Sequence, residues 1–361
     1  MPWAIRVPLL PDESIASWLA RVALTQGCDP LSLTGSIWPK WRVWTIDIDR
    51  GIPSERLRIL SEVSGESAHA LAAAGLRDVA ETICSKPLNA KLVWPWILAI
   101  GSRNRRRHGG LQYCSVCLAS DATPYFRRHW RLAWHTTCSI HGTALRDRCH
   151  ACGAPLEPHR LSAEDTHLAT CARCRADLRD APRGAFSLEA AAFQKVADET
   201  IQRRGGSFGG LQLSAGEWFN TARFLTRAVR QAGGRGGSRL ADALRLVGGS
   251  IYGEASPASG LPLELLAVEE RASLLGAIHV LIKKGPLELD RALRMSGLSL
   301  RSIHAGQAVP NCIIDVFYPL PARRSRTIGR REKRDSAPKP QHVVMAAWAR
   351  LQRKILAKDL G

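Results

Sequence analysis

Apolar residues recur at helical spacing along most of the chain, which predicts a mainly α-helical fold. The first stripe follows a capping segment at 11–14 and ends at Gly27. Further helices are expected over 54–64, with Ser54 as the cap, and over 66–74. These helices form a helix-turn-helix pattern. The last of them carries almost no base-reading side chains, so docking to a protein is favoured over reading DNA at this end.

The segment 33–50 lacks this spacing and contains Trp38, Trp41 and Trp44 among β-branched residues. It predicts irregular or short extended structure. Tryptophans can stack on bases, but a place in the hydrophobic core is the favoured interpretation.

The stretch after residue 180 is expected to be helical throughout. Helices are predicted from Ser187, after the capping box Ser214-x-x-Glu217, from 238, over 261–283 and from Pro286, with 203–210 as a flexible connector. A Ser-Gly turn and a helix from 299 would complete a second helix-turn-helix. Its candidate contacts to bases or phosphates are Ser299, Arg301, Ser302 and His304. A structural helix pair is an equally good interpretation.

Four short-spaced pairs of cysteine and histidine lie between residues 114 and 174. They are Cys114-x-x-Cys117, Cys138-x-x-His141, Cys149-x-x-Cys152 and Cys171-x-x-Cys174. A two-residue spacer lets both side chains of a pair reach one tetrahedral ion, so eight ligands predict two zinc ions per chain. Both sites would be closed, with no position for a catalytic water.

Pairing in chain order is preferred, with the first two pairs in one site and the last two in the other. A cross-braced arrangement uses the same residues and stays open. Disulfides are disfavoured because no apolar export segment opens the sequence, and we expect a cytoplasmic protein with reduced thiols. The isolated Cys28, Cys84 and Cys312 are expected to be small buried hydrophobes. His150, beside Cys149, is the strongest substitute ligand.

Aromatic and basic residues alternate over 125–134, between the first and second ligand pairs. We expect zinc-ribbon hairpin strands here, with aromatic side chains packed around the metal and arginines facing outward. The aromatic residues are Phe126, Trp130 and Trp134, and the arginines are Arg127, Arg128 and Arg131.

The fold class predicted from these patterns is mainly α with two small zinc-ribbon-type modules and helix-turn-helix units at both ends. Four parts are expected: an N-terminal helical domain over 1–110, a tandem zinc-binding module over 111–180, a C-terminal helical domain over 181–320, and a basic tail with a terminal helix over 321–361.

A formal net charge of +19 favours a polyanionic partner, with DNA the first candidate. Two arginine clusters are placed to bind phosphates, one before the zinc module and one in the tail. Their residues are Arg103, Arg105, Arg106, Arg107, Arg323, Arg324, Arg326, Arg330, Arg331, Lys333 and Arg334. A solvated loop or linker is the alternative in each case. No apolar run approaches the ~20 residues of a membrane span.

Catalytic motifs were sought and are missing from the sequence. There is no His-Glu-x-x-His, no Gly-x-Ser-x-Gly and no phosphate-binding loop, and the acidic residues are scattered. We therefore expect no enzymatic activity, with a zinc-dependent nucleic-acid enzyme as the least favoured class.

Several of these motifs together resemble the TniQ family, the relatives of TnsD. The resemblance covers about residues 7–180 and rests on the opening segment 7–21, the Tyr-Cys-x-x-Cys of 113–117, the Tyr-Phe-Arg of 125–127 and the Trp-x-x-x-Cys-x-x-His-Gly of 134–142. It implies the eight zinc ligands residue by residue. It also implies a non-catalytic protein that selects targets for a DNA transposon.

The partners implied by this resemblance are target DNA, an AAA+ ATPase of the TniB/TnsC type and, through it, the transposase. In some relatives the protein docks on a CRISPR effector complex instead, which makes a protein adaptor for RNA-guided transposition the alternative function. The sequence does not indicate whether the protein forms a homodimer, which target site is chosen, or which of these two routes is used.

Overall fold

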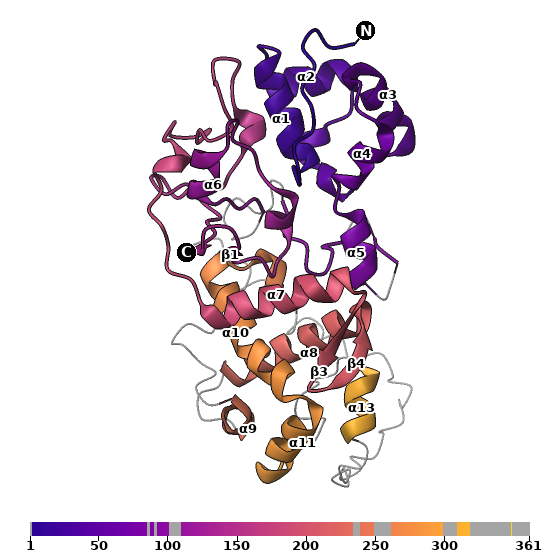
Figure 1. Ribbon diagram of the computed structural model, residues 1–361, viewed down its shortest axis with the longest axis vertical. Helices are drawn as coiled ribbons and strands as arrows, with labels where there is room; N and C mark the ends of the chain where they lie inside the picture. The colour runs from indigo at the N-terminus through magenta and orange to yellow at the C-terminus, as the bar shows by residue number, and fades with distance from the viewer. Residues whose placement is uncertain are drawn as a thin grey trace. The chain divides into compact units, whose positions relative to one another are not determined.

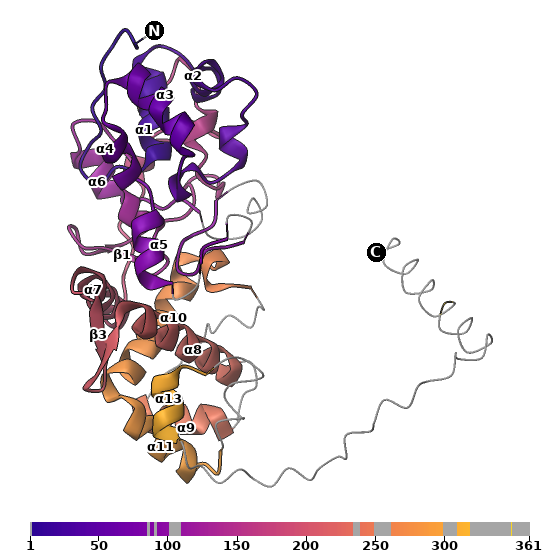
Figure 2. The ribbon, with the colours of Figure 1, turned by 90° about the vertical axis from the view of Figure 1, so that its right-hand side faces the viewer.

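The computed structural model describes residues 2–84, 87–89, 92–100, 110–233, 239–248, 261–298, 309–317 and 348. The chain divides into two compact units, Met1–Leu320 and Pro321–Gly361. The described part of the first unit is mainly helical, and Figures 1 and 2 show it from two sides. Among the described residues, no helix combines the length and the apolar character needed to span a membrane.

Short helices and 3-10 turns make up the N-terminal part. They are α1 Ile15–Thr25, α2 Pro30–Ile37, η1 Val43–Thr45, η2 Ile48–Arg50, α3 Ser54–Ser64, α4 Ala68–Ala73 and α5 Arg77–Ile83. The Ser14 hydroxyl caps α1 by accepting from the Ser17 amide at 3.2 Å, as expected. Gly65 ends α3 in the left-handed conformation, at φ 74°.

Two expectations for this part were wrong in detail. The start of the segment 33–50 is part of α2, because Asp29 caps a helix there and Pro30 occupies its first turn, and the remainder is irregular with two 3-10 turns rather than extended. Ser54 is the first residue of α3 rather than its cap. Trp38 is buried, as the core interpretation requires.

The region of the ligand pairs has little regular structure. Its elements are α6 Ser115–Ser120, η4 Arg128–Arg131, β1 Thr137–Cys138, β2 Thr143–Ala144, η5 Pro158–Arg160 and η6 Leu178–Asp180. Strands β1 and β2 pair in antiparallel fashion, with Cys138 opposite Thr143. The hairpin predicted over 125–134 is absent, because that segment contains the 3-10 turn η4 instead.

Longer helices follow residue 187. The elements are α7 Leu188–Gln202, β3 Gly205–Phe208, β4 Leu211–Ser214, α8 Ala215–Gly233, α9 Arg239–Gly248, η7 Leu263–Leu265, α10 Val268–Lys284, α11 Pro286–Met295 and α13 Asn311–Phe317. Helix α7 lies against α10, and β3 contacts α7 and α8 (Figure 1). The capping box of α8 is confirmed, because the Glu217 carboxylate accepts from the Ser214 amide at 3.0 Å and the Ser214 hydroxyl accepts from the Glu217 amide at 3.4 Å.

Two expectations for this half need correction. The predicted connector 203–210 is largely strand β3, which pairs with β4 through a turn at Gly209 and Gly210. The helix expected over 261–283 begins only at Val268, after the 3-10 turn η7.

Three hydrophobic clusters hold the first unit together. One lies among α1 to α4 and includes Trp18 and Trp38. A second surrounds the ligand cysteines. The largest contains residues of α7 to α11 together with residues from the ranges 76–98 and 132–134. The side chains of Trp96 and Trp134 therefore pack in the same core as the later helices.

The helix-turn-helix units are not shown. At the N-terminal end, α2 and two 3-10 turns separate α1 from α3. At the other end, α11 is present, but the second helix expected from 299 lies outside the described residues. The four-part division of the chain stays a prediction.

Candidate metal centres

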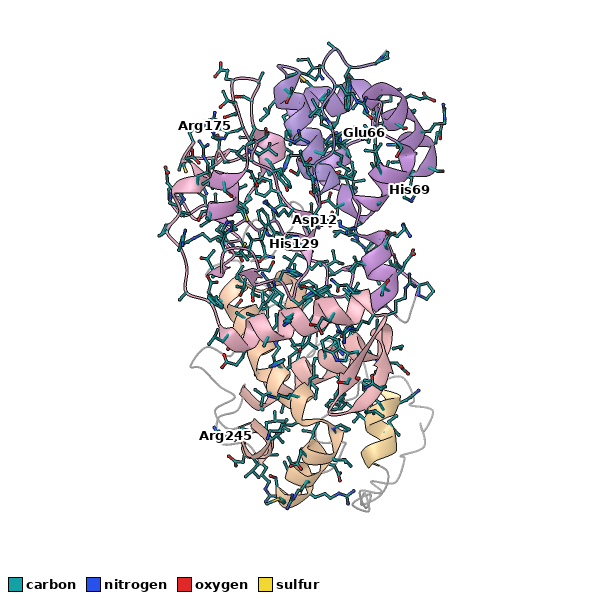
Figure 3. All side chains as sticks on the ribbon, viewed as in Figure 1. Asp12, Glu66, His69, His129, Arg175 and Arg245 are labelled. Atoms are coloured by element: carbon teal, nitrogen blue, oxygen red, sulfur yellow. The ribbon has the colours of Figure 1, made fainter. Side chains whose placement is uncertain are left out.

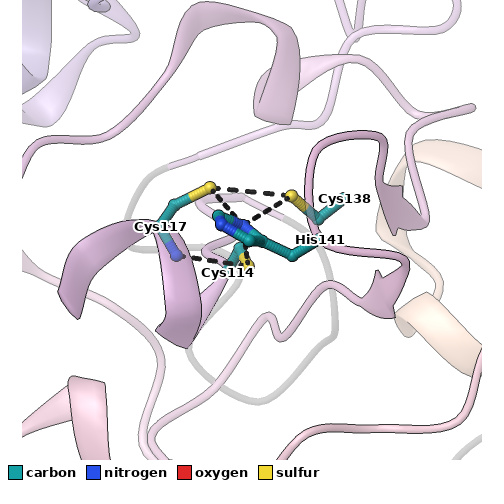
Figure 4. Close-up of side chains that lie close together, drawn as sticks. All are labelled: Cys114, Cys117, Cys138 and His141. Carbon is teal, nitrogen blue, oxygen red and sulfur yellow. Dashed lines mark hydrogen bonds between the residues drawn. The ribbon is translucent and has the colours of Figure 1, made fainter. Parts of the chain in front are cut away.

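Cys114, Cys117, Cys138 and His141 meet in one cluster (Figure 4). Cys114 precedes α6, and its sulfur accepts from the Cys117 amide at 3.5 Å. The other two side chains lie on and beside the β1–β2 hairpin. There Gly142, at φ 54°, donates its amide to the Cys138 carbonyl at 2.9 Å and closes the loop.

The spacing of these four side chains fits a tetrahedral ion. Cys117 and Cys138 have their sulfurs 3.6 Å apart, and His141 Nδ1 lies 3.2 to 3.7 Å from the three sulfurs. Zinc–ligand bonds of about 2.3 Å to sulfur and 2.0 Å to nitrogen place tetrahedral ligand atoms roughly 3.5–3.8 Å apart. A disulfide would require sulfurs at about 2.05 Å, so the cysteines are free thiols here.

Cys149, Cys152, Cys171 and Cys174 form the second cluster. The sulfurs of Cys149 and Cys174 are 3.7 Å apart, and those of Cys152 and Cys171 are 3.8 Å apart. These distances fit the edges of the same tetrahedron. The structure therefore groups the ligand pairs in chain order and not in the cross-braced arrangement.

Three of the four pairs have the same loop geometry. In each, the residue four positions after the first cysteine has a positive φ and donates its amide to that cysteine's carbonyl, at 2.9 to 3.0 Å. Glycine fills this position twice, as Gly142 and Gly153. Arg175 fills it in the third loop, at φ 66°, and its guanidinium forms an ion pair with the buried carboxylate of Asp165. This contact holds an unfavourable backbone conformation in place.

The two clusters differ in exposure. The three cysteines of the first cluster are at most 2% exposed. In the second, Cys152 is partly exposed and Cys174 is exposed. The second cluster is therefore open to solvent on one side, while the protein covers the first.

The thiols of the first cluster lie close enough together to shift one another's pKa values. Hydrogen bonds to Cys114 and Cys138, with burial, raise the pKa of the Cys117 thiol far above its ordinary value. Hydrogen bonds from Cys114 and Cys117 lower the pKa of Cys138 correspondingly. Only one thiol of this set can ionise readily by itself. A divalent ion would stabilise all three as thiolates, which is the form that binds metal.

Side chains of the later helices hold the first cluster in place. On α7, Gln194 Oε1 accepts from the Thr136 and Thr137 amides at 3.1 and 3.2 Å, and its Nε2 donates to the Thr137 carbonyl at 3.0 Å. Thr137 directly precedes the ligand Cys138. The Asp198 carboxylate accepts from Trp134 Nε1 at 2.8 Å and lies 2.9 Å from His135 Nε2. Burial lowers the pKa of His135.

Arg271 of α10 is another anchor that sequence reasoning missed. It is fully buried and donates to the Ala133 carbonyl at 2.6 Å and to Gln112 Oε1 at 2.7 Å. Burial lowers its pKa to about 10, so it stays charged at neutral pH. These contacts join residues more than 130 positions apart, and no local sequence pattern indicates them.

The arginines between the ligand pairs do not all face outward. Arg131 is fully buried and forms ion pairs with Asp47 and Asp49 of the N-terminal part. Arg127 is also buried, and it binds Asp121 at 2.8 Å between the rings of Tyr125 and Trp130. Their charges are neutralised inside the protein, which removes them from any DNA-binding surface. The three expected aromatic residues are buried, but only Phe126 and Trp130 pack around the ligand cysteines, whereas Trp134 packs with the later helices.

Asp12 connects the start of α1 with η4. Its carboxylate pairs with His129, beside it in Figure 3, and with Arg128 at 3.4 Å. Asp12 has a positive φ of 55°, and its carbonyl accepts from the Arg128 amide at 2.6 Å. The ligand region and the N-terminal helices thus form one hydrogen-bonded body.

The predicted DNA contacts all fall outside the described residues. This holds for the arginines of 103–107, for Ser299, Arg301, Ser302 and His304, and for the arginines and lysine of 323–334. Their role stays a prediction. His150 is not part of either cluster. The three isolated cysteines are partly rather than fully buried.

Comparison with known proteins agrees with this architecture. Residues 4–145 match the TniQ family, and this span includes the N-terminal helices and the whole first cluster. No curated protein matches the chain. Proteins of this family are generally non-catalytic and act in DNA transposition. Membership of the family implies a role in selecting the transposition target. Residues 4–145 are therefore a TniQ family domain.

Proposed function

We propose that this protein selects target sites for a DNA transposon by linking target DNA to an AAA+ ATPase of the TniB/TnsC type and through it to the transposase. The observation that carries the proposal is the TniQ domain over 4–145, joined by Gln194, Asp198 and Arg271 to a second helical half. One end can then bind a protein while the other binds DNA.

Two zinc ions are the cofactors in this proposal. The eight side chains are thiolate and imidazole donors at tetrahedral spacing, which is the donor set that zinc prefers. All four positions of each site are filled by protein, so the ions would have a structural role and supply folding free energy. No water-activating position is left, in keeping with a non-catalytic protein.

Direct reading of DNA is assigned to the second half and the tail. The chain carries +19 overall, and the tail from 321 onward has twelve lysines and arginines against three acidic residues. In the proposed second helix-turn-helix, Arg301 is the side chain best suited to a bidentate contact with guanine, worth roughly 1–3 kcal/mol of discrimination. The tail arginines would bind phosphates with little sequence preference.

Mapping insertion sites in a reaction with the ATPase and transposase tests the proposal. Adding the protein should concentrate insertions at particular sites. Arg301→Ala should redistribute them, while a variant of a tail arginine such as Arg331→Ala should lower their number without moving them. An insertion pattern that is the same with and without the protein would refute target selection. A pattern altered only by loss of residues 1–80, and not by Arg301→Ala, would identify an adaptor for a separate targeting complex.

A further inference from the structure

A groove lined by tryptophans lies on the N-terminal part, and none of the eight ligand residues lines it. It has a volume of about 350 Å³ and is formed by α2 and the segment that follows it. The lining includes Leu31, Thr34, Lys40, Trp41, Arg42 and Trp44. The surface of the groove is almost entirely apolar, so it suits an apolar side chain.

Inward contacts fix the shape of the groove. Trp38 Nε1 donates to the Arg56 carbonyl at 3.2 Å, and the Arg56 guanidinium lies 4.0 Å from the centre of the Trp41 ring. Trp44 Nε1 donates to Thr34 Oγ1 at 2.9 Å, and its ring stacks on His159. These rings are held before any partner binds, which lowers the entropic cost of binding.

Apolar side chains remain exposed at the groove. Leu31 in its wall is 55% exposed, and Ile46, directly after the lining residue Thr45, is 45% exposed. Two cations, Lys40 and Arg42, lie in the lining and are exposed, and no acidic residue lines the groove. Its charge therefore complements a partner with carboxylates.

The lining offers few free polar groups. The Thr34 hydroxyl donates to the Pro30 carbonyl and accepts from Trp44, and the Thr45 hydroxyl donates to the Arg42 carbonyl at 2.7 Å. A nucleic-acid base placed here would lose the hydrogen bonds of its edge to water without replacement. An aliphatic or aromatic hydrocarbon side chain makes no hydrogen bonds to water, so its burial in the groove does not carry this cost. The tail of this chain is a poorer match for the same cations, because its basic residues outnumber its acidic ones.

We propose that this groove binds an acidic peptide segment of a partner protein, which inserts a large apolar side chain between Trp41 and Leu31 while its carboxylates pair with Lys40 and Arg42. Such anchoring by one or two apolar residues is a common mode of peptide recognition. The groove is a protein-docking site on the TniQ domain, distinct from the proposed DNA contacts of the second half. It does not depend on the proposed function.

Fluorescence anisotropy with the full chain and synthetic peptides tests the groove. The probe is a labelled peptide of about eight residues with a central leucine–phenylalanine pair flanked by glutamates. One control replaces the glutamates with lysines, and another replaces the central pair with glycine and serine. The acidic apolar probe should bind at least about tenfold more tightly than either control, equivalent to roughly 1.4 kcal/mol.

Variants of the protein make the test specific. The double variant Lys40→Glu with Arg42→Glu should lose about tenfold for the acidic probe and gain affinity for the lysine-flanked one. Leu31→Ser should weaken binding of both probes, and because Leu31 is exposed, this variant should fold normally by circular dichroism. Lys195→Glu, an exposed cation of α7, is the matched control and should change nothing.

Three results would overturn the proposal. One is equal binding of the acidic and lysine-flanked probes. Another is acidic-probe binding that the variants of Leu31, Lys40 and Arg42 leave unchanged. The third is tighter binding of an oligothymidylate than of the acidic probe, lost in the same variants, which would identify the groove as a nucleic-acid site.

Discussion

Arg131 is a buried cation that joins distant parts of the chain. It pairs with Asp47 at 2.6 Å and also with Asp49, whose other carboxylate oxygen accepts from the Ala16 amide at 2.8 Å. Its guanidinium donates to the Leu98 carbonyl at 2.8 Å as well. Burial raises the pKa of Asp49 and opposes its ionised form, and the charge of Arg131 counteracts this effect.

Replacing Arg131 with alanine should therefore leave two carboxylates buried without a counter-charge. We expect the free energy of unfolding to fall by about 3–5 kcal/mol in urea denaturation. Arg58→Ala, in the exposed ion pair with Glu62, is the control and should cost less than about 1 kcal/mol. A loss at Arg131 no larger than that at Arg58 would show that the buried network contributes nothing.

Gly209 allows a close approach between two backbones. It has a φ of 55°, and a Cβ atom there would lie 2.2 Å from Gly285 Cα at the end of α10. Gly209→Ala should thus destabilise the protein more than the 1–2 kcal/mol typical of a left-handed residue. Gly210→Ala, at φ 92° with nothing within 4 Å of its Cβ, should show only the conformational cost. Equal melting temperatures for the two variants would contradict the packing of this turn.

Among the elements, the metal-binding loops were the most predictable from sequence. A short spacer between ligands is local information, and the glycines at Gly142 and Gly153 mark the left-handed position of two loops. The caps at Ser14, Ser187 and Ser214 are local as well, and each is present.

Elements that depend on distant contacts were not predictable. The turn η4 occupies a segment whose alternating pattern indicated strands, because Arg131 is drawn into the protein by carboxylates more than 80 residues away. The β3–β4 hairpin did have a local signal, a Gly-Gly turn between apolar residues, but its glycines also fit a flexible connector. In the structure the Gly209 amide donates to the Ile282 carbonyl at 2.9 Å, which fixes the turn on α10.

The different exposure of the two clusters predicts an order of metal loss. Cys174 is exposed, whereas the cysteines of the first cluster are covered. A chelator should thus remove zinc in two phases, with the faster phase lost in Cys174→Ser. Zinc release followed with a chromogenic chelator measures this. A single phase in the wild-type protein would contradict the difference in access.

For the whole molecule, the basic tail predicts salt-dependent DNA binding. Each phosphate that the protein neutralises makes the decline of log affinity with log salt steeper by about 0.9. Neutralising Arg323, Arg324, Arg326, Arg330, Arg331 and Arg334 together should reduce the slope by several units on DNA of any sequence. An unchanged slope would show that the tail does not contact DNA.

Two clusters could each hold a metal ion, and the first of them lies between the TniQ domain and the rest of the chain. Gln194 and Asp198 hold the segment next to Cys138, so the first cluster lies where the domain meets the later helices. Losing a zinc ion from the first cluster should loosen both the TniQ domain and the later helices. Cys117→Ser should accordingly leave protein that is insoluble or rapidly proteolysed.

Elemental analysis of the purified full chain tests this claim most directly. We predict about two zinc ions per chain, since eight ligands in two tetrahedral sets match that number. Cys149→Ser should reduce the content to about one, with the first cluster retained. A content below about one zinc per wild-type chain, or an unchanged content in Cys149→Ser, would contradict the account.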